Sequence, residues 1–218
     1  MKLYYWNRIV NLGDVLNRLL FPDATWASPS SATQVAIGSV LESFDGFTGT
    51  VFGTGRAGPH SPPTDLSKAR VLALRGMGTR ELALGTDVKV LGDPGLLITA
   101  EREERLDLVT VPHWSDQERT KARWPTATFV DVTGDPHEAI ATIASARRVI
   151  ASSLHGLVLA DAFGIPRMWD WFDGVQGGGF KFEDYGSVVG AFEPGEWHQP
   201  DVTHIKRELK ECLSVSVS

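Results

Sequence analysis

The feature that most constrains the fold of this chain is the alternation of two kinds of segment. Short runs of apolar and β-branched residues recur, and each is followed by a turn containing Gly or Asp and then by a stretch with apolar residues at helical spacing. Parallel strands need a helix-sized connection, so this order predicts parallel sheets with helices on their faces. The sequence therefore predicts an α/β fold.

The predicted elements form two series along the chain. In the first half we expect strands at residues 3–6, 34–38, 50–53, 70–74 and 88–91, with helices at 14–20 and 79–84. In the second half we expect strands at 106–111, 128–132 and 148–151, with helices at 116–123, 136–146, 154–163 and 203–213. A proline-rich stretch at 56–67 is expected to be a loop.

A charged run, AEREERL at residues 100–106, separates the two series. We expect the chain to divide there into two small Rossmann-like domains, residues 1–100 and residues 105–218, with the last helix in the second. The alternative is a single domain in which this run is a solvated helix face. Both halves are short, so that alternative stays open at this point.

Charge and cysteine content exclude several classes of function. The net charge is −6, and the 21 basic and 27 acidic residues are spread along the chain, which argues against nucleic acid as a partner. Cys212 is the only cysteine, so neither an intramolecular disulfide nor a cysteine zinc cluster can form. Neither a signal sequence nor a membrane-length apolar run is present. We expect a soluble, cytoplasmic protein.

The strongest local signal is the passage from the strand RRVIA into SSLHGLVLADAFG. Ser152 or Ser153 is placed to cap a helix, and His155 and Gly156 then fall in its first turn. In open parallel sheets, ligands bind beyond the carboxyl ends of the strands, where helix N-termini attract anions. One interpretation is a phosphate or carboxylate beside His155. The other is a histidine that only caps its helix.

Two further motifs combine a strand end with charged residues. In LALRGMGTREL, Arg75 and Arg80 flank glycines at a helix start and are candidates for holding an anion, although Arg80 equally suits a surface ion pair. In NLGDVLN, Asn11, Gly13 and Asp14 begin the first helix. Asp14 is either a charge that stabilises the helix N-terminus, or a base or a contact to a sugar hydroxyl.

Three other motifs follow strands or lie in loops. VTVPHWSD places His113 directly after a strand, where anion binding, ring stacking and a purely structural role all remain open. GGGFKFEDYGS offers Lys181 as a charged contact, and its three glycines are expected to make the backbone mobile or able to approach a ligand. LGDPGLL indicates a strand end with a tight Asp-Pro-Gly turn.

The sequence gives little support for a bound cofactor. No HExxH-like spacing, P-loop or GxSxG motif occurs, and the glycines at 53, 55 and 58 lead into the proline-rich stretch, so they are only a weak indication of a dinucleotide site. We therefore expect neither a metal ion nor a bound cofactor.

Taken in order, the six motifs NLGDVLN, LALRGMGTREL, LGDPGLL, VTVPHWSD, SSLHGLVLADAFGIP and GGGFKFEDYGS resemble the polysaccharide pyruvyl transferase family. The resemblance implies a GT-B-like fold, with two Rossmann-like domains facing a cleft. It also implies transfer of pyruvate from phosphoenolpyruvate, a co-substrate, to a sugar, commonly as a ketal. The implied acceptors are a sugar, a nucleotide sugar or a lipid-linked saccharide, the last with peripheral contact to a membrane.

The same resemblance implies roles for individual residues. His155 stands where the family has its proposed catalytic acid, and the two arginines and His113 lie in motifs expected near the donor. Better-studied members have an arginine two residues before this histidine, where this chain has Ser153. The donor would then be held by the other cations, Lys181 included. The remaining candidates are Asp14 as a second catalytic residue, with Asn11, Gly13, Ser152, Ser153 and Gly156 as substrate contacts.

Two other functions fit the same motifs. A GT-B glycosyltransferase would use a sugar nucleotide and would need a nucleobase pocket. A degenerate family member that binds a ligand without catalysis would fit the short chain and the serine at position 153.

Overall fold

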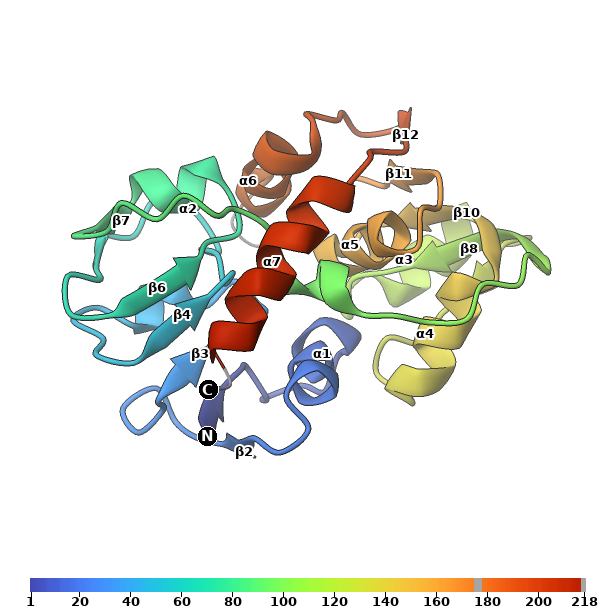
Figure 1. Cartoon of the computed structure of the whole chain (residues 1–218). Helices are drawn as coiled ribbons and strands as arrows, with labels where there is room; N and C mark the ends of the chain where they lie inside the picture. Colours follow the sequence, from blue (N-terminus) through green and yellow to red (C-terminus); the bar gives the residue numbers. More distant parts are fainter. Residues whose placement is uncertain (175–177, 217–218) are drawn as a thin grey trace.

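Two five-stranded sheets form the framework of the computed structural model, which describes residues 1–174 and 178–216 (Figure 1). The first sheet is parallel throughout and has the order β2-β1-β3-β4-β6. Its strands are β1 (Lys2–Tyr4), β2 (Thr25–Trp26), β3 (Gln34–Val35), β4 (Thr50–Phe52) and β6 (Arg70–Ala73).

The second sheet has the order β12-β11-β10-β8-β9 and is parallel except for the edge strand β12. Its strands are β8 (Leu106–Val111), β9 (Thr128–Phe129), β10 (Ala146–Ala151), β11 (Arg167–Trp169) and β12 (Trp197–His198). The last three residues of β10 are all buried, as expected for a parallel strand covered on both faces. The predicted α/β class is confirmed.

The helices begin where the sequence offers capping residues. Asn11 caps α1 (Leu12–Leu20), Asp135 caps α4 (Pro136–Ala144) and Ser153 caps α5 (Leu154–Ala162), each through its side chain. The other helices are α2 (Met77–Glu81), α3 (Gln117–Arg123), α6 (Phe180–Val189) and α7 (Thr203–Ser216), with two short 3₁₀ turns, η1 (Leu41–Ser43) and η2 (Pro94–Leu97).

The region between β6 and η2 differs from the prediction. The predicted strand at 88–91 forms only one bridge, from Leu91 to Leu74, because the chain turns at Gly92 into the Asp93 cap of η2. The helix predicted at 79–84 has other bounds, because α2 ends at Glu81 and the next residues form the strand β7 (Ala83–Leu84). β7 pairs with β5 (Thr64–Asp65), so the predicted loop at 56–67 contains a short strand.

In the glycine-rich motif GGGFKFEDYGS, the residues after the three glycines form a helix, and the predicted role of the glycines stays a prediction. α6 begins at Phe180, directly after Gly179, and Phe182 and Tyr185 are buried along it. Gly177 lies outside the described residues. The helix fixes Lys181 in its first turn, so this side chain projects from a rigid element.

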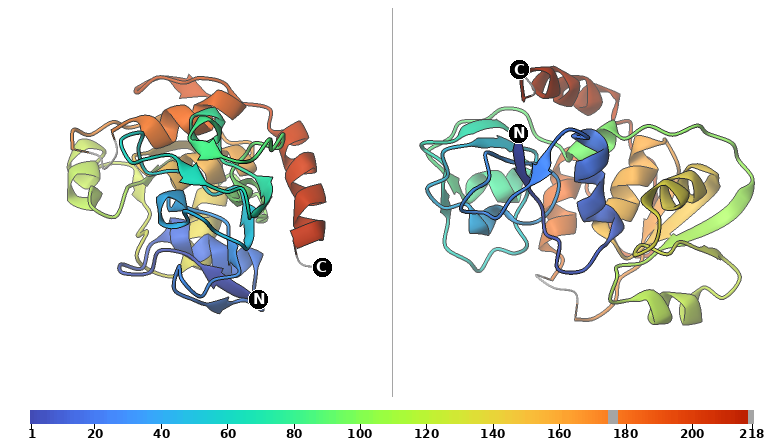
Figure 2. Two further views of the ribbon diagram at one scale, coloured as in Figure 1. Left: turned by 90° about the vertical axis from the view of Figure 1, so that its left-hand side faces the viewer. Right: turned by 90° about the horizontal axis from the view of Figure 1, so that it is seen from below.

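The last helix returns to the first sheet. α7 packs against β4, β6 and η2, with Ile205 and Leu209 buried beneath it. In Figures 1 and 2 it lies on the outside of the molecule, along the side where the two sheets approach each other. No helix within residues 1–174 and 178–216 has the length and apolarity needed to cross a membrane.

Both halves of the chain contribute to one large buried cluster. It contains Leu3 and Leu16 from the first half and Val109 and Leu157 from the second. α1 and α5 pack together, so their N-termini, which follow β1 and β10, face the same region. The division into domains at residue 100 stays a prediction.

Candidate active site

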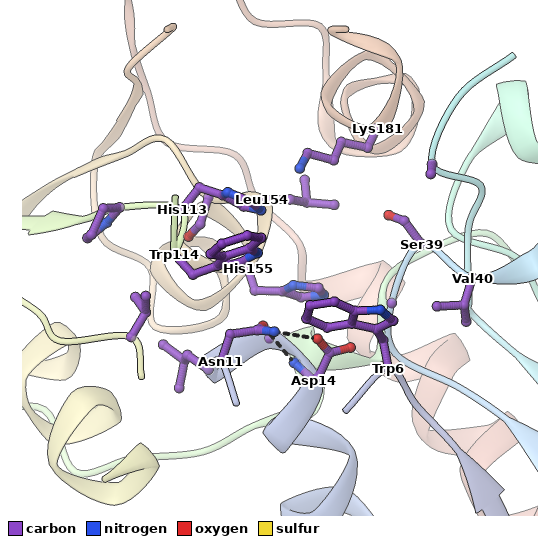
Figure 3. Close-up of a pocket in the computed structure, with 17 residues that line it drawn as sticks. Trp6, Asn11, Asp14, Ser39, Val40, His113, Trp114, Leu154, His155 and Lys181 are labelled. Carbon is purple, nitrogen blue, oxygen red and sulfur yellow. Dashed lines mark hydrogen bonds between the residues drawn. The ribbon is translucent and has the colours of Figure 1, made fainter. Parts of the chain in front are cut away.

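A cavity of about 200 Å³ lies where the N-termini of α1 and α5 meet the loop after β8. Figure 3 shows the side chains that surround it. Both halves of the chain supply the lining. The first half contributes Trp6, Asn11, Leu12, Gly13, Asp14, Gly38, Ser39, Val40 and Ala57; the second contributes Pro112, His113, Trp114, Val132, Ser153, Leu154, His155 and Lys181.

The first turn of α5 forms one wall of the cavity. The Ser153 hydroxyl accepts a hydrogen bond from the Gly156 N–H at 3.0 Å, which confirms that Ser153, rather than Ser152, caps the helix. Ser152 is buried, and its hydroxyl accepts the His113 N–H at 2.9 Å. His155 therefore sits at the positive end of a helix, with the β8 loop fixed beside it.

His155 lies directly against the backbone of α1. A methyl group at Gly13 would collide with Nδ1 of the His155 ring, so a side chain at position 13 would displace the imidazole. Glycine is required here for close approach, since its backbone angle is ordinary. Gly13 thus acts by making room for the histidine, and the predicted substrate contact at this position is untested.

Asp14 lies in the first turn of α1 and lines the same cavity. Asn11 Nδ2 donates to Asp14 Oδ2 at 2.6 Å, and Asn11 Oδ1 accepts the Asp14 N–H at 3.3 Å (Figure 3). Burial raises the pKa of Asp14 from 3.8 to about 6, and the Asn11 hydrogen bond and the charge of His155 only partly oppose this effect. A carboxyl with this pKa can exchange a proton near neutral pH.

Lys181 and His113 are the other two ionisable side chains that line the cavity. Burial, with the nearby positive charge of Arg75, lowers the pKa of Lys181 to about 8. Burial also lowers the pKa of His113 to about 4, with smaller effects from the charges of Lys181 and His155. No carboxylate of the described residues lies within ion-pair distance of Lys181. At neutral pH the cavity therefore holds an unpaired lysine cation and a neutral His113.

Arg75 does not line the cavity. It is fully buried, and Nε donates to Asp184 Oδ2 at 2.9 Å, forming what we call the Arg75–Asp184 pair. Its other two nitrogens donate to the Ser39 hydroxyl at 2.5 Å and the Arg56 carbonyl at 2.6 Å. Asp184 also accepts from the N–H and the hydroxyl of Thr79. The anion at the start of α2 is thus an internal carboxylate, and the donor contact through Arg75 stays a prediction.

Three other predicted residues also lie outside the cavity. Arg80 is partly exposed in the last turn of α2, and it is absent from the lining. Ser152 acts through the His113 backbone. Gly156 packs α5 onto the sheet, because a side chain there would press on Ala151 and Val111.

Three residues near the site, Trp6, Trp114 and Asp93, were not among the candidates taken from the sequence. Trp6 lies on the rim and stacks on Trp114, with ring centroids 6.4 Å apart. Asp93 is fully buried behind His155, with Oδ2 at 3.6 Å from Nε2 of the imidazole. The motif LGDPGLL predicts the turn that contains Asp93. Nothing in the neighbouring sequence shows that the carboxyl group of Asp93 faces His155.

The fold and this cavity define an α/β protein with an anion-favouring site at the carboxyl ends of parallel strands. Comparison with known proteins gives two similarities over large parts of the chain. Residues 65–169 match the model of the polysaccharide pyruvyl transferase family. The succinoglycan biosynthesis protein ExoV of Rhizobium meliloti (strain 1021) is 25% identical over 203 residues, which is 87% of this chain and 56% of that protein. Over residues 65–169 the chain is similar to the polysaccharide pyruvyl transferase family.

A second relative is an uncharacterized protein of Acanthamoeba polyphaga mimivirus. It is 34% identical over 114 residues, covering 46% of this chain and 40% of that protein. The chain therefore spans about half the length of the curated relatives it matches.

Proposed function

We propose that this protein transfers the pyruvyl group of phosphoenolpyruvate to hydroxyls of a sugar or glycoconjugate, as a ketal, with release of phosphate. The observation that carries the proposal is the convergence of His155, Lys181 and two helix N-termini on one small cavity. The helix ends and the lysine favour the carboxylate and phosphate of the donor. His155 lies beside them as a proton donor. The reaction is expected in the cytoplasm, where this donor is made.

The size and position of the cavity favour this donor over a sugar nucleotide. Pockets for drug-sized ligands span roughly 300–1,000 Å³, whereas this cavity has about 200 Å³. Its lining comes from both halves of the chain, which supports a GT-B arrangement with the donor in the cleft. Trp6 and Trp114 offer flat apolar faces at the rim, against which the acceptor sugar would pack.

The proposed mechanism gives each residue one task. His155 donates a proton to the methylene carbon of phosphoenolpyruvate, and the adjacent carbon becomes electrophilic. A sugar hydroxyl oxygen attacks that carbon while Asp14 accepts the hydroxyl proton, which suits its pKa of about 6. A second hydroxyl then forms the other C–O bond of the ketal as the bond to phosphate breaks, and its proton leaves with the phosphate. Proton return from Asp14 to His155 through solvent resets the site.

The test is turnover in D₂O with phosphoenolpyruvate and a panel of glycosides that carry pairs of free hydroxyls. The expected result is acceptor-dependent phosphate release, with one deuterium in the methyl group of the product. His155→Ala should abolish this release. His204→Ala, an exposed histidine on α7, is the matched control and should leave it unchanged.

Other outcomes would overturn the proposal. Cleavage of a sugar nucleotide without phosphoenolpyruvate would identify a glycosyltransferase. Binding of phosphoenolpyruvate with no turnover on any acceptor would identify a binding protein. An active His155→Ala protein would remove the acid assignment.

A further inference from the structure

Two buried polar atoms face each other behind the cavity. Asp93 Oδ2 and His155 Nε2 are both shielded from solvent, and neither has a hydrogen-bond partner at normal distance among residues 1–174 and 178–216. They lie 3.6 Å apart. A buried polar atom without a partner is costly, so two such atoms in reach of each other indicate one interaction that is loose in the empty site.

The position of Asp93 is fixed independently of His155. Its other oxygen, Oδ1, accepts the Gly95 N–H at 2.8 Å and so caps η2. Pro94 follows in the first position of η2, and η2 packs directly on α5. One carboxylate oxygen therefore holds the turn, while the other is directed at the imidazole. A residue needed only as a cap would not have to place its second oxygen against a buried ring nitrogen.

The two ring nitrogens of His155 lie in different surroundings. Nε2 is buried against Asp93, whereas Nδ1 lies on the side of the ring next to Gly13 and the cavity. A carboxylate only accepts hydrogen bonds, so in the neutral ring the proton belongs on Nε2. Nδ1 then carries the lone pair that faces the cavity.

We propose that Asp93 is a positioning residue that holds the proton of neutral His155 on Nε2 and leaves Nδ1 as the atom that exchanges a proton with the substrate. The buried carboxylate also supplies negative charge behind a ring that becomes cationic at a helix N-terminus, where cations are disfavoured. Asp14, His113 and Lys181 face the ring from the cavity side. The exchange of a proton between Nδ1 and the substrate rests on the proposed function, whereas the tautomer of His155 does not depend on that function.

Asp93→Asn tests this without removing the cap. The asparagine oxygen can still accept the Gly95 N–H, which places its NH₂ group against Nε2. Two donors cannot face each other, so the neutral ring must move its proton to Nδ1. Two-bond ¹H–¹⁵N correlation spectra of ¹⁵N-histidine protein, recorded where His155 is neutral, should show the Nε2–H form in the wild type and the Nδ1–H form in D93N.

The matched control is Asp135→Asn, the same change at the cap of α4, where the side chain accepts the His137 N–H. D135N should leave the His155 tautomer unchanged. A wild-type ring in the Nδ1–H form, or the same tautomer in wild type and D93N, would overturn the proposal. The wild-type spectrum alone decides this if D93N does not fold.

Activity gives a second, separable readout. If the pyruvyl transfer is found, D93N should lower kcat by about 10²–10⁴-fold, because the proton sits on the wrong nitrogen, and should leave the affinity for phosphoenolpyruvate nearly unchanged. If no turnover is found, the spectra still test Asp93. Unchanged kcat in D93N would contradict the positioning role.

Discussion

The Arg75–Asp184 pair and the cavity both bring the two halves of the chain together, but they treat their charges differently. In the pair, all three guanidinium nitrogen positions donate to defined oxygens, and Asp184 accepts from Thr79 as well. In the cavity, Lys181 has no carboxylate partner in the described part of the chain, and burial raises the pKa of Asp14. The difference suggests a criterion for the proposed site: a buried cation without an ion-pair partner in the protein is a better candidate for ligand binding than one that is fully paired.

The Arg75–Asp184 pair and the cavity are neighbours that share Ser39. Arg75 donates to Ser39, which lines the cavity, and its charge contributes to the lowered pKa of Lys181. Arg75 therefore adds positive potential to the cavity without contacting a ligand. Arg75 has protein partners for its guanidinium group, and we propose that Lys181 binds the anion.

The largest expected effect is at the pair itself. Arg75→Met should lower the free energy of unfolding by about 3–5 kcal/mol, because it leaves Asp184 buried without its cation. Urea unfolding followed by circular dichroism measures this. The control is Arg148→Ala, which breaks a partly exposed ion pair with Asp107 and should cost at most about 1 kcal/mol. If the Arg75→Met protein is as stable as the wild type but fails to bind phosphoenolpyruvate, then Arg75 binds the donor and is not needed for stability.

The next effect is at Asp14, whose pKa is raised to about 6 in the folded protein. Between its usual value of 3.8 and about 6, the folded state holds a proton that the unfolded state has lost, so rising pH removes stability. Asp14→Asn should therefore be more stable than the wild type by roughly 2–3 kcal/mol at pH 7.5 and nearly equal to it at pH 3.5.

Asp131→Asn provides a control of opposite sign for this measurement. Hydrogen bonds from Thr133 lower the pKa of Asp131, so its ionised form stabilises the fold at neutral pH and this contribution is lost in acid. Asp131→Asn should be less stable than the wild type at pH 7.5, and the difference should disappear as the pH falls. A stability gap between Asp14→Asn and wild type that does not change with pH would contradict the buried, proton-binding Asp14.

The smallest expected effect is on donor affinity. Lys181→Met should weaken binding of phosphoenolpyruvate by about 10–100-fold at pH 7, the loss of one charge-assisted hydrogen bond, as measured by isothermal titration calorimetry. Wild-type affinity should fall as the pH rises through about 8, where Lys181 loses its proton. Lys181→Arg should bind at pH 9 better than the wild type, because arginine stays charged. Equal affinity of Lys181→Met and wild type would show that the unpaired lysine is not the donor cation.

The sequence predicts the parts of the fold that depend on local pattern. The apolar strand β10, the Ser153 cap and the end of α5 at Gly164, which has a φ of 65°, were all recognisable within about fifteen residues. Errors arose where pairing partners are distant. The segment at 88–91 has the composition of a strand, yet only one residue finds a neighbour before the chain turns at Gly92.

The candidate site shows the same difference between features set by local sequence and contacts between distant residues. Asn11, Gly13, Asp14, His113, Ser153, His155 and Lys181 do line one cavity, as expected for residues at the ends of parallel strands and helix starts. Arg75 lies outside this cavity, and its pairing could not be foreseen because Asp184 lies 109 residues away in sequence. The contact between Asp93 and His155 is equally non-local. Residue types and turns can be identified from a sequence, whereas the pairing of buried charges depends on the tertiary fold.

The return of α7 to the first sheet has a consequence for synthesis. A chain leaves the ribosome from its N-terminus, and early segments usually begin to fold first. Here β4 and β6 are covered by α7, which follows β6 much later in the chain. The part of the first sheet that α7 covers therefore stays exposed until α7 has been synthesised. Contacts between such distant segments also slow folding.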